Sequence, residues 1–305
     1  MLAPTPVLDS LDLDCRCDLW QCSPVLSPAE FADLRQQLAL NCFKWDAQVG
    51  DVSTLAPFAL ILPPQTWQQL ATLAEQLSAE AIAAETELLQ RPELIQRLGL
   101  PRSVRLALLA QAPVQKAMPP AARVCRYDFH PTPEGWQISE ANNDVPGGYT
   151  EASNFCQMMA ARLPGTQPAG NPAAQLVEAL VAQMGGPRAI ALISAPGYLE
   201  DQQITAYLAE LLHQRGCQAY LASPQQIYWP ESGEAPQAYL RSQWHHGPLA
   251  AVLRFYQGEW MTRLPTDYDW SYFFGGSRTP ICNPGAALLI ESKRFSLVWA
   301  ALKTP

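Results

Sequence analysis

The chain has 305 residues, of which 48% are hydrophobic, and a formal net charge of -8. This length and apolar content are enough for a buried core and predict about two domains. The acidic balance disfavours a general nucleic-acid or membrane-surface protein, because phosphate groups would be repelled. A local basic pocket for a nucleotide remains compatible with it.

The sequence predicts a cytoplasmic protein that does not cross a membrane. Its most apolar stretches, such as 189–198, are far shorter than a membrane-spanning helix requires. Asp9, Asp12 and Asp14 stand where a secretory signal would carry a basic start and an apolar block. The eight cysteines are scattered, so we expect reduced thiols.

The N-terminal part predicts helices after an irregular, proline-rich segment at 1–26. Ser27-Pro28-Ala29-Glu30 has the pattern of a helix start with a capping box, and apolar spacing continues to Leu40. A longer helix is expected at about 65–90, and a short one at 92–98. The apolar stripe expected on the long helix consists of Trp67, Leu70, Leu73, Leu77 and Ile82.

From Arg123 the hydrophobic period changes from helical spacing to two. Residues 123–130 and 136–142 predict two strands of a hairpin, and Pro131-Thr132-Pro133-Glu134-Gly135 is the expected turn. Residues 150–163 are typical of a helix. The Pro/Gly-rich stretch 164–172 then predicts a domain boundary.

The second half of the chain predicts an α/β arrangement. Strands are expected at 189–194, 217–221 and 249–255, with an amphipathic helix at 200–215 between the first two. Strands that alternate with helices favour a parallel sheet with right-handed crossovers. A further helix is expected at 286–302, carrying Lys293 near its start.

The predicted hairpin gathers polar side chains on one face. Alternate residues of a strand share a face, so Arg126 and Asp128 lie together, as do Glu140 and Asn142. A register with Asp128 opposite residue 138 or 140 joins all four in one patch. Two nearby carboxylates repel unless a cation neutralises them. Oxygen ligands favour Mg²⁺ together with substrate phosphates. The alternative is an exposed surface ion pair, worth only about 0–1 kcal/mol.

These residues resemble a known family. Arg-x-Asp, Glu-x-Asn and the following Asn143-Asp144-Val145-Pro146-Gly147 are similar to the metal hairpin of the circularly permuted ATP-grasp family, which includes glutathionylspermidine synthase. The resemblance implies that Asp128, Glu140 and Asn142 hold Mg²⁺. It also implies that Arg126 is catalytic and faces the transferred phosphate or the substrate carboxylate.

The resemblance continues downstream in the same order. Val252-Leu253-Arg254 resembles a strand that carries an arginine into the site, and Asn283-Pro284 with Lys293 resembles the segment of a nucleotide-binding lysine. It therefore implies ATP as cofactor, bound by Lys293 and Arg254. The implied fold is a permuted ATP-grasp, with an N-terminal helical segment and a Rossmann-like pre-ATP-grasp α/β domain.

The implied domains are 1–164 with the helices and the hairpin, 165–260 as the α/β domain, and 261–305 as the truncated start of an ATP-binding lobe. The implied activity is an ATP-dependent carboxylate–amine ligase that works through an acyl phosphate. Its substrates would be a small peptide or amino-acid carboxylate and an amine. The sequence leaves the oligomeric state open, a homodimer included.

The sequence is also compatible with two other functions. The resembling enzymes continue for on the order of a hundred residues, about one domain, with a second lysine and a Gly-rich loop. A chain without these parts is compatible with a catalytically degenerate protein that binds ligands. A scaffold is the other alternative, because the aromatics of 228–274 look exposed. These include Trp229, Trp244, Trp260 and Trp270.

Overall fold

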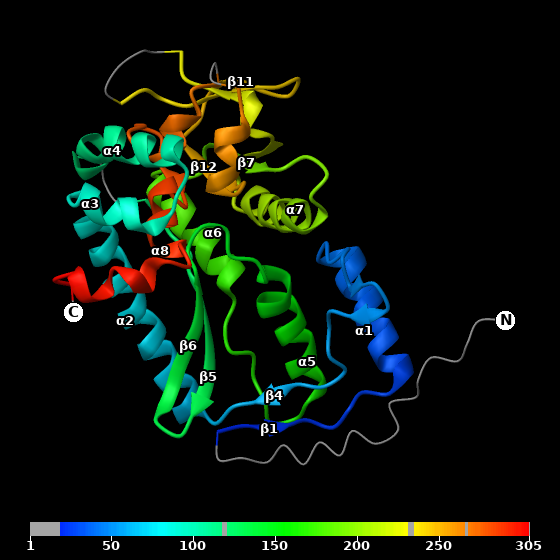
Figure 1. The fold of residues 1–305 in the computed structure, drawn as a ribbon. Helices are drawn as coiled ribbons and strands as arrows, with labels where there is room; N and C mark the ends of the chain where they lie inside the picture. The colour runs from blue at the N-terminus through cyan, green and yellow to red at the C-terminus, as the bar shows by residue number, and fades with distance from the viewer. Residues whose placement is uncertain (1–18, 118–120, 231–234, 266–267, 305) are drawn as a thin grey trace.

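A four-stranded parallel sheet forms the centre of the fold in the computed structural model, which describes residues 19–117, 121–230, 235–265 and 268–304 (Figure 1). The strand order is β13-β12-β7-β8, and every neighbouring pair is parallel. The protein is thus a mixed α/β protein with a parallel sheet, as predicted. The strands are β7 Ala189–Ser194, β8 Gln218–Ala222, β12 Ala251–Phe255 and β13 Ile281–Cys282.

Helices cover both faces of this sheet because its central strands are apolar on both sides. Ile190 and Leu192 of β7 pack in the cluster that contains residues of α6 Pro172–Gln183 and α7 Leu199–Gln214. Ala191 and Ile193 belong to the opposite cluster, as alternation along a strand requires. That second cluster takes in residues of α2 Pro64–Leu89, α3 Pro92–Ile95 and α4 Arg102–Ala117.

The N-terminal helix α1 Pro28–Asn41 begins as predicted. The Ser27 hydroxyl accepts from the Glu30 N–H at 3.3 Å, and the Glu30 carboxylate accepts from the Ser27 N–H at 2.9 Å. This reciprocal pair is a capping box. Residues 1–18 of the predicted irregular segment lie outside the described residues.

The remaining short strands are β1 Gln21–Cys22, β2 Gln48–Val49, β3 Val52–Ser53, β4 Leu60–Ile61, β9 Ile227–Tyr228, β10 Tyr239–Arg241 and β11 His246–Pro248.

Helix α2 has the predicted length, but the predicted apolar stripe is wrong in part, because only Leu70, Leu73 and Leu77 of its five residues are half-buried. Trp67 and Ile82 are each 44% exposed, whereas Ala84 and Leu88 near the C-terminal end are buried. The C-terminal end of α2 contributes to the large core cluster that also holds residues of α3 and α4. Tertiary contacts at one end of the helix therefore select its buried residues, and the periodicity of its sequence does not.

The predicted hairpin is present as β5 Arg126–Thr132 and β6 Gly135–Asn142, and Figure 1 shows it projecting from the sheet with its turn at the far end. Arg126 pairs with Asn142 and Asp128 with Glu140. The register shifts at a bulge between Asp128 and Phe129. Among the described residues, the two strands pair only with each other.

The segment after the hairpin is helical, as expected for 150–163. A π-helical turn, Glu151–Phe155, leads into α5 Cys156–Arg162. Helices α4 and α6 were not predicted.

Within the described part of the chain, no helix combines the length and hydropathy needed to cross a bilayer. The division into domains at 164 and 260 stays a prediction, and one core cluster draws residues from all three segments.

The long helix predicted at 286–302 is wrong. Helix α8 spans only Leu288–Glu291, and short 3-10 turns follow at Phe295–Leu297 and Trp299–Ala301. Ser292 ends α8 with an extended backbone of ψ 123°, and its hydroxyl donates to the Leu98 carbonyl at 2.8 Å. Lys293 therefore lies just after a one-turn helix and not near the start of a long one.

The central strand offers a test of this core. Leu192→Ala should lower the free energy of unfolding by about 2–5 kcal/mol, because Leu192 is fully buried and its removal leaves a cavity. Leu221→Ala is the matched control in β8, since Leu221 is 55% exposed. It should change stability by less than about 0.5 kcal/mol. Equal losses in denaturant unfolding would contradict this assignment of the core.

Candidate functional site

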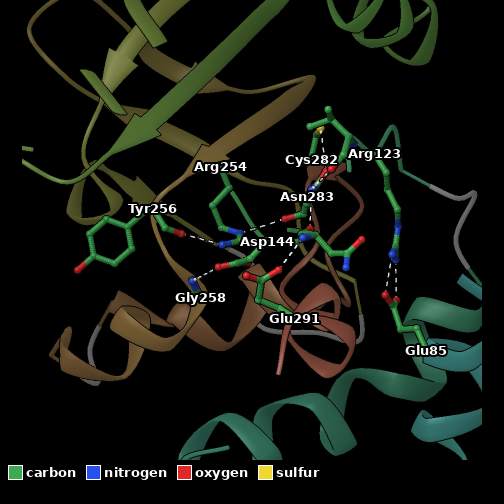
Figure 2. A network of polar contacts seen from close by, with 11 residues as sticks. Glu85, Arg123, Asp144, Arg254, Tyr256, Gly258, Cys282, Asn283 and Glu291 are labelled. Atoms are coloured by element: carbon green, nitrogen blue, oxygen red, sulfur yellow. Dashed lines mark hydrogen bonds and ion pairs between the residues drawn. The ribbon is translucent and has the colours of Figure 1, made fainter. Parts of the chain in front are cut away.

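A buried ion pair holds the end of the hairpin to the sheet. Arg254 of β12 is 1% exposed and donates to the carboxylate of Asp144, which follows β6 (Figure 2). Its other donors reach the carbonyls of Asn283 at 3.0 Å and Tyr256 at 2.7 Å. The second oxygen of Asp144 accepts from the Gly258 N–H at 2.8 Å. The guanidinium and the carboxylate thus both have partners, as buried charges require.

Asn283 joins both strands of the hairpin at their bases. Its side-chain oxygen accepts from the Val124 N–H at 2.9 Å, and its amide group donates to the carbonyls of Val124 and Asn143, each at 2.7 Å. Arg123 adds a bidentate pair with Glu85 of α2, with both distances 2.6 Å. The hairpin is therefore anchored to the sheet and to α2 at the end that carries its polar patch.

The four polar residues of the hairpin lie on one face. The directly opposed pairs are Arg126 with Asn142 and Asp128 with Glu140. Arg126 makes a bidentate contact with Asp128, at 2.8 and 3.3 Å. The hydrogen bond to Asp128 raises the pKa of Arg126. The two side chains are 43% and 41% exposed, so water and ligands reach them.

Lys293 joins this patch from the segment that follows α8. Its Nζ lies 2.8 Å from an oxygen of Glu140, and this hydrogen bond raises the pKa of Lys293. The lysine side chain is 75% exposed. Two cations and two carboxylates thus form one exposed cluster, in which Arg126 pairs with Asp128 and Lys293 pairs with Glu140. We call this cluster, together with Asn142, the hairpin patch: Arg126, Asp128, Glu140, Asn142 and Lys293.

The donor set of the hairpin patch fits a magnesium ion. Asp128, Glu140 and Asn142 supply oxygen atoms alone, as this hard cation prefers. The side-chain oxygen of Asn142 is buried and has no hydrogen-bond partner. A buried acceptor without a donor is costly, and a bound cation would satisfy it. No three His, Cys, Asp or Glu side chains gather elsewhere in the described chain as an alternative metal site.

A cavity of about 550 Å³ opens beside the hairpin patch. Arg126, Asn142 and Lys293 line it from the patch, and Glu200 and Asp201 line it from the first turn of α7. Gln257 to Trp260 and the end of α8 complete the wall, although Gly258 does not line it. Its size is in the range of small-molecule sites.

One acid in this cavity is held partly protonated. Asp201 is 5% exposed, and burial, reinforced by the nearby charge of Glu200, raises its pKa to about 7. Its oxygen accepts from Gln257 at 3.4 Å. Burial likewise raises the pKa of Glu291, whose carboxylate accepts from the Asn143 N–H at 2.6 Å. The cavity can therefore hold or release a proton near neutral pH.

The structure separates Arg254 from the other residues proposed for the site. Arg254 was expected to bind the cofactor, yet its donors are directed at Asp144, Tyr256 and Asn283 inside the core. We assign it the role of positioning the hairpin and do not include it among ligand contacts. Sequence reasoning missed Asp144 as its partner, although an arginine inside an apolar strand requires an acid.

The expectation of exposed aromatics between 228 and 274 is also wrong in part. Trp229 is buried at 6% exposure, and Trp260 and Trp270 pack against the core. Trp244 alone of the four named is strongly exposed, at 78%. This removes most of the evidence for a scaffold surface.

Comparison with known proteins gave a structural likeness only. No family model matches the chain, and no curated protein matches it. Its structure is similar to that of a glutathione synthetase-like effector, GSS30, from Globodera pallida in its apo form. The identity is 18%, the TM-score 0.49, and the match covers 78% of this chain and 56% of the other. The chain thus spans little more than half of that protein.

The buried ion pair makes a stability prediction. Arg254→Met should lower the free energy of unfolding by about 3–5 kcal/mol, because it leaves Asp144 charged and buried without its partner. The double variant Arg254→Met with Asp144→Leu should recover part of this loss. Arg215→Met breaks the exposed pair with Glu178 and should cost less than about 1 kcal/mol in the same denaturant unfolding.

Asp201 predicts a dependence of stability on pH. Because its pKa rises from 3.8 to about 7 on folding, the folded protein keeps a proton that the unfolded chain releases in this window. The free energy of unfolding should therefore fall as the pH rises from 4 to 7. Asp201→Asn removes this effect, because the amide does not titrate. The free energy of unfolding of the variant minus that of the wild type should therefore rise by up to about 4 kcal/mol between pH 4 and pH 7. If urea unfolding shows a stability difference between variant and wild type that does not vary with pH, the raised pKa of Asp201 is contradicted.

Proposed function

We propose that this protein is an ATP-dependent ligase that joins a carboxylate to an amine. The single observation that carries the proposal is the hairpin patch, in which two carboxylates, one unpaired amide oxygen and two cations share one exposed face beside a cavity. Phosphoryl transfer depends on positioning and on charge stabilisation, and these groups supply both. The proposal includes ATP and Mg²⁺ as ligands.

Arg126 and Lys293 would contact the anionic groups of the substrates. Arg126 is placed to form a bidentate contact with a phosphate or carboxylate, and Lys293 to pair with a nucleotide phosphate. Asp128, Glu140 and Asn142 would hold Mg²⁺, which when bound draws negative charge off the phosphates. The present ion pairs keep the two cations in place, and their exposure leaves them weak enough to exchange partners.

The chemistry of the proposed reaction follows from these contacts. The carboxylate of an amino acid or small peptide attacks the γ-phosphate of ATP, so that an acyl phosphate forms and ADP leaves. Arg126 stabilises the charge that develops on the transferred group. The amine then attacks the acyl carbon, which forms the amide and releases phosphate. The cavity of about 550 Å³ has room for these substrates next to the patch.

A second candidate is a protein that binds the same ligands without turnover. The observation that favours it is that Asp128 and Glu140 each already have a cationic partner, which neutralises the repulsion between them. In this case the hairpin patch would bind anions but would not accelerate transfer.

The hairpin carboxylates test the ligase directly. Asp128→Asn and Glu140→Gln should each lower turnover at least about a hundredfold, because they remove charge that positions the metal and the phosphates. The assay is release of ADP from ATP and Mg²⁺ with a panel of amino acids, short peptides and amines, and mass spectrometry of the amide. Glu134→Gln in the exposed hairpin turn is the matched control and should keep full activity.

The two candidates give different results in this assay. Loss of turnover in both variants, with circular dichroism unchanged, supports the ligase. Binding of MgATP without ADP formation under any substrate combination supports the binding protein. Full turnover in both variants would remove the hairpin from the mechanism.

A further inference from the structure

A small antiparallel sheet at the end of the molecule away from the hairpin turn has one buried face and one open face (Figure 1). Its strands lie in the order β11-β10-β9. On one face, Ile227 and Leu240 are fully buried in the core. Alternation along the strands assigns the neighbours of these two residues to the other face, where none is buried. The side chains of this open face are Tyr228, Tyr239, Arg241 and His246.

An aromatic ring supports Arg241 on this open face. Its guanidinium carbon lies 4.6 Å from the ring centroid of Tyr228. The ring of Tyr228 packs beside Tyr239, with centroids 5.7 Å apart, and its hydroxyl lies 3.0 Å from Nε2 of His246. Among the described residues the guanidinium has no hydrogen-bond or ion-pair partner. An arginine held against a ring in this way keeps its planar set of donors for a bidentate contact with a carboxylate.

The turn between β10 and β11 holds Trp244 in solvent. The hydroxyl oxygen of Ser242 accepts from the N–H groups of Trp244 at 3.2 Å and His245 at 3.0 Å, and the Ser242 N–H donates to the His245 carbonyl at 2.9 Å. The ring of His245 stacks on Tyr220 of β8, with centroids 4.8 Å apart. Trp244 is 78% exposed on this fixed turn. An aromatic side chain that is already held in place loses little conformational entropy when a partner covers it.

The charge of this region favours an acidic protein partner. None of the described residues in 218–230 and 235–249 is Asp or Glu, whereas Arg241 is exposed. At physiological ionic strength, charges interact over about 8 Å, so this local charge affects a ligand on the open face more than the net charge of -8 does. Trp, Tyr and Arg contribute most of the binding energy at protein interfaces. A nucleic acid would need several cations along its phosphates, and this face offers one arginine.

The strand β11 also has a free backbone edge. Ser242 with His245, and Ala238 with Leu249, are hydrogen-bonded pairs of the ladder between β10 and β11. In an antiparallel ladder such pairs alternate with pairs that are not bonded, so the N–H and carbonyl of His246 are directed away from β10. Among the described residues, β11 pairs with β10 alone. An extended peptide beside β11 would therefore find backbone partners next to the open face.

We propose that this surface binds an extended acidic segment of a partner protein. We call it the β10–β11 face, and it consists of Tyr228, Tyr239, Arg241, Trp244 and His246. A carboxylate of the segment pairs with Arg241, its backbone bonds to His246, and an apolar side chain packs on Trp244. None of these residues lines the cavity beside the hairpin patch, so the inference does not depend on the proposed ligase activity.

Two labelled peptides test the inference by fluorescence anisotropy with the whole chain. In one capped peptide glutamate and phenylalanine alternate, and in the other glutamine replaces each glutamate. The glutamate peptide should bind the wild type at least about tenfold more tightly, because it alone can form the charged pair with Arg241. Arg241→Ala should abolish this preference. Arg35→Ala is the matched control, since the Arg35 guanidinium also lies over a ring, 5.8 Å from Phe31 in α1, and it should change neither affinity.

Trp244→Ala gives an independent measurement. It should weaken both peptides severalfold, because both carry the apolar side chains, whereas Trp299→Ala removes another exposed ring, at 57% exposure, and should weaken neither. Equal affinity of the two peptides for the wild type, or no binding of either, overturns the inference. Equal effects of Arg241→Ala and Arg35→Ala would place the peptide elsewhere and also overturn it. A labelled single-stranded oligothymidylate is the third probe. If Arg241→Ala weakens this probe and not the glutamate peptide, the face binds nucleic acid and the inference is wrong.

Discussion

The ion pair between Arg254 and Asp144 determines where the hairpin stands. Both residues are buried, and each charge is compensated by the other and by the backbone groups around them. The pair joins β12 to the residues that leave β6, and Asn283 binds the residues that enter β5. A two-stranded hairpin alone has marginal stability in water, so these buried contacts make its base a fixed platform.

The hairpin patch has the opposite character to this anchor. Its ion pairs are exposed and contribute little to stability, so their geometry can change when a ligand arrives. The side-chain oxygen of Asn142 within the patch is buried and has no hydrogen-bond partner. The buried contacts hold the base of the hairpin in place, and the exposed ion pairs of the patch can exchange partners. A site for anionic ligands needs both properties.

The end of the short helix α8 joins the hairpin patch to the cavity beside it. Because Ser292 turns the chain out of the helix and bonds to Leu98, Lys293 projects beside Glu140. Glu291, one residue before Ser292, accepts a hydrogen bond from the backbone N–H of Asn143 and so faces the base of the hairpin. Lys293 thus belongs to the hairpin patch and also lines the cavity, together with Glu291 and Ser292. A longer helix would carry the chain away from this junction.

The sequence by itself determined the features that depend on near neighbours. The capping box at Ser27 and Glu30, the parallel sheet and a hairpin with Asp128 opposite residue 138 or 140 all follow from spacing of a few residues and from a short turn. The structure selects the pairing of Asp128 with Glu140. The same local spacing predicted that Arg126, Asp128, Glu140 and Asn142 share a face.

Only the tertiary structure decided the contacts between distant parts of the chain. The partner of Arg254 lies 110 residues away, and the contact that ends α8 joins residues 194 apart. The elements that pack on the C-terminal end of α2 determine which of its residues are buried, so the apolar stripe alone did not identify Ala84 and Leu88. Such contacts depend on which buried charges and surfaces meet in space, and hydrophobic period and capping patterns describe only the chain close to each residue.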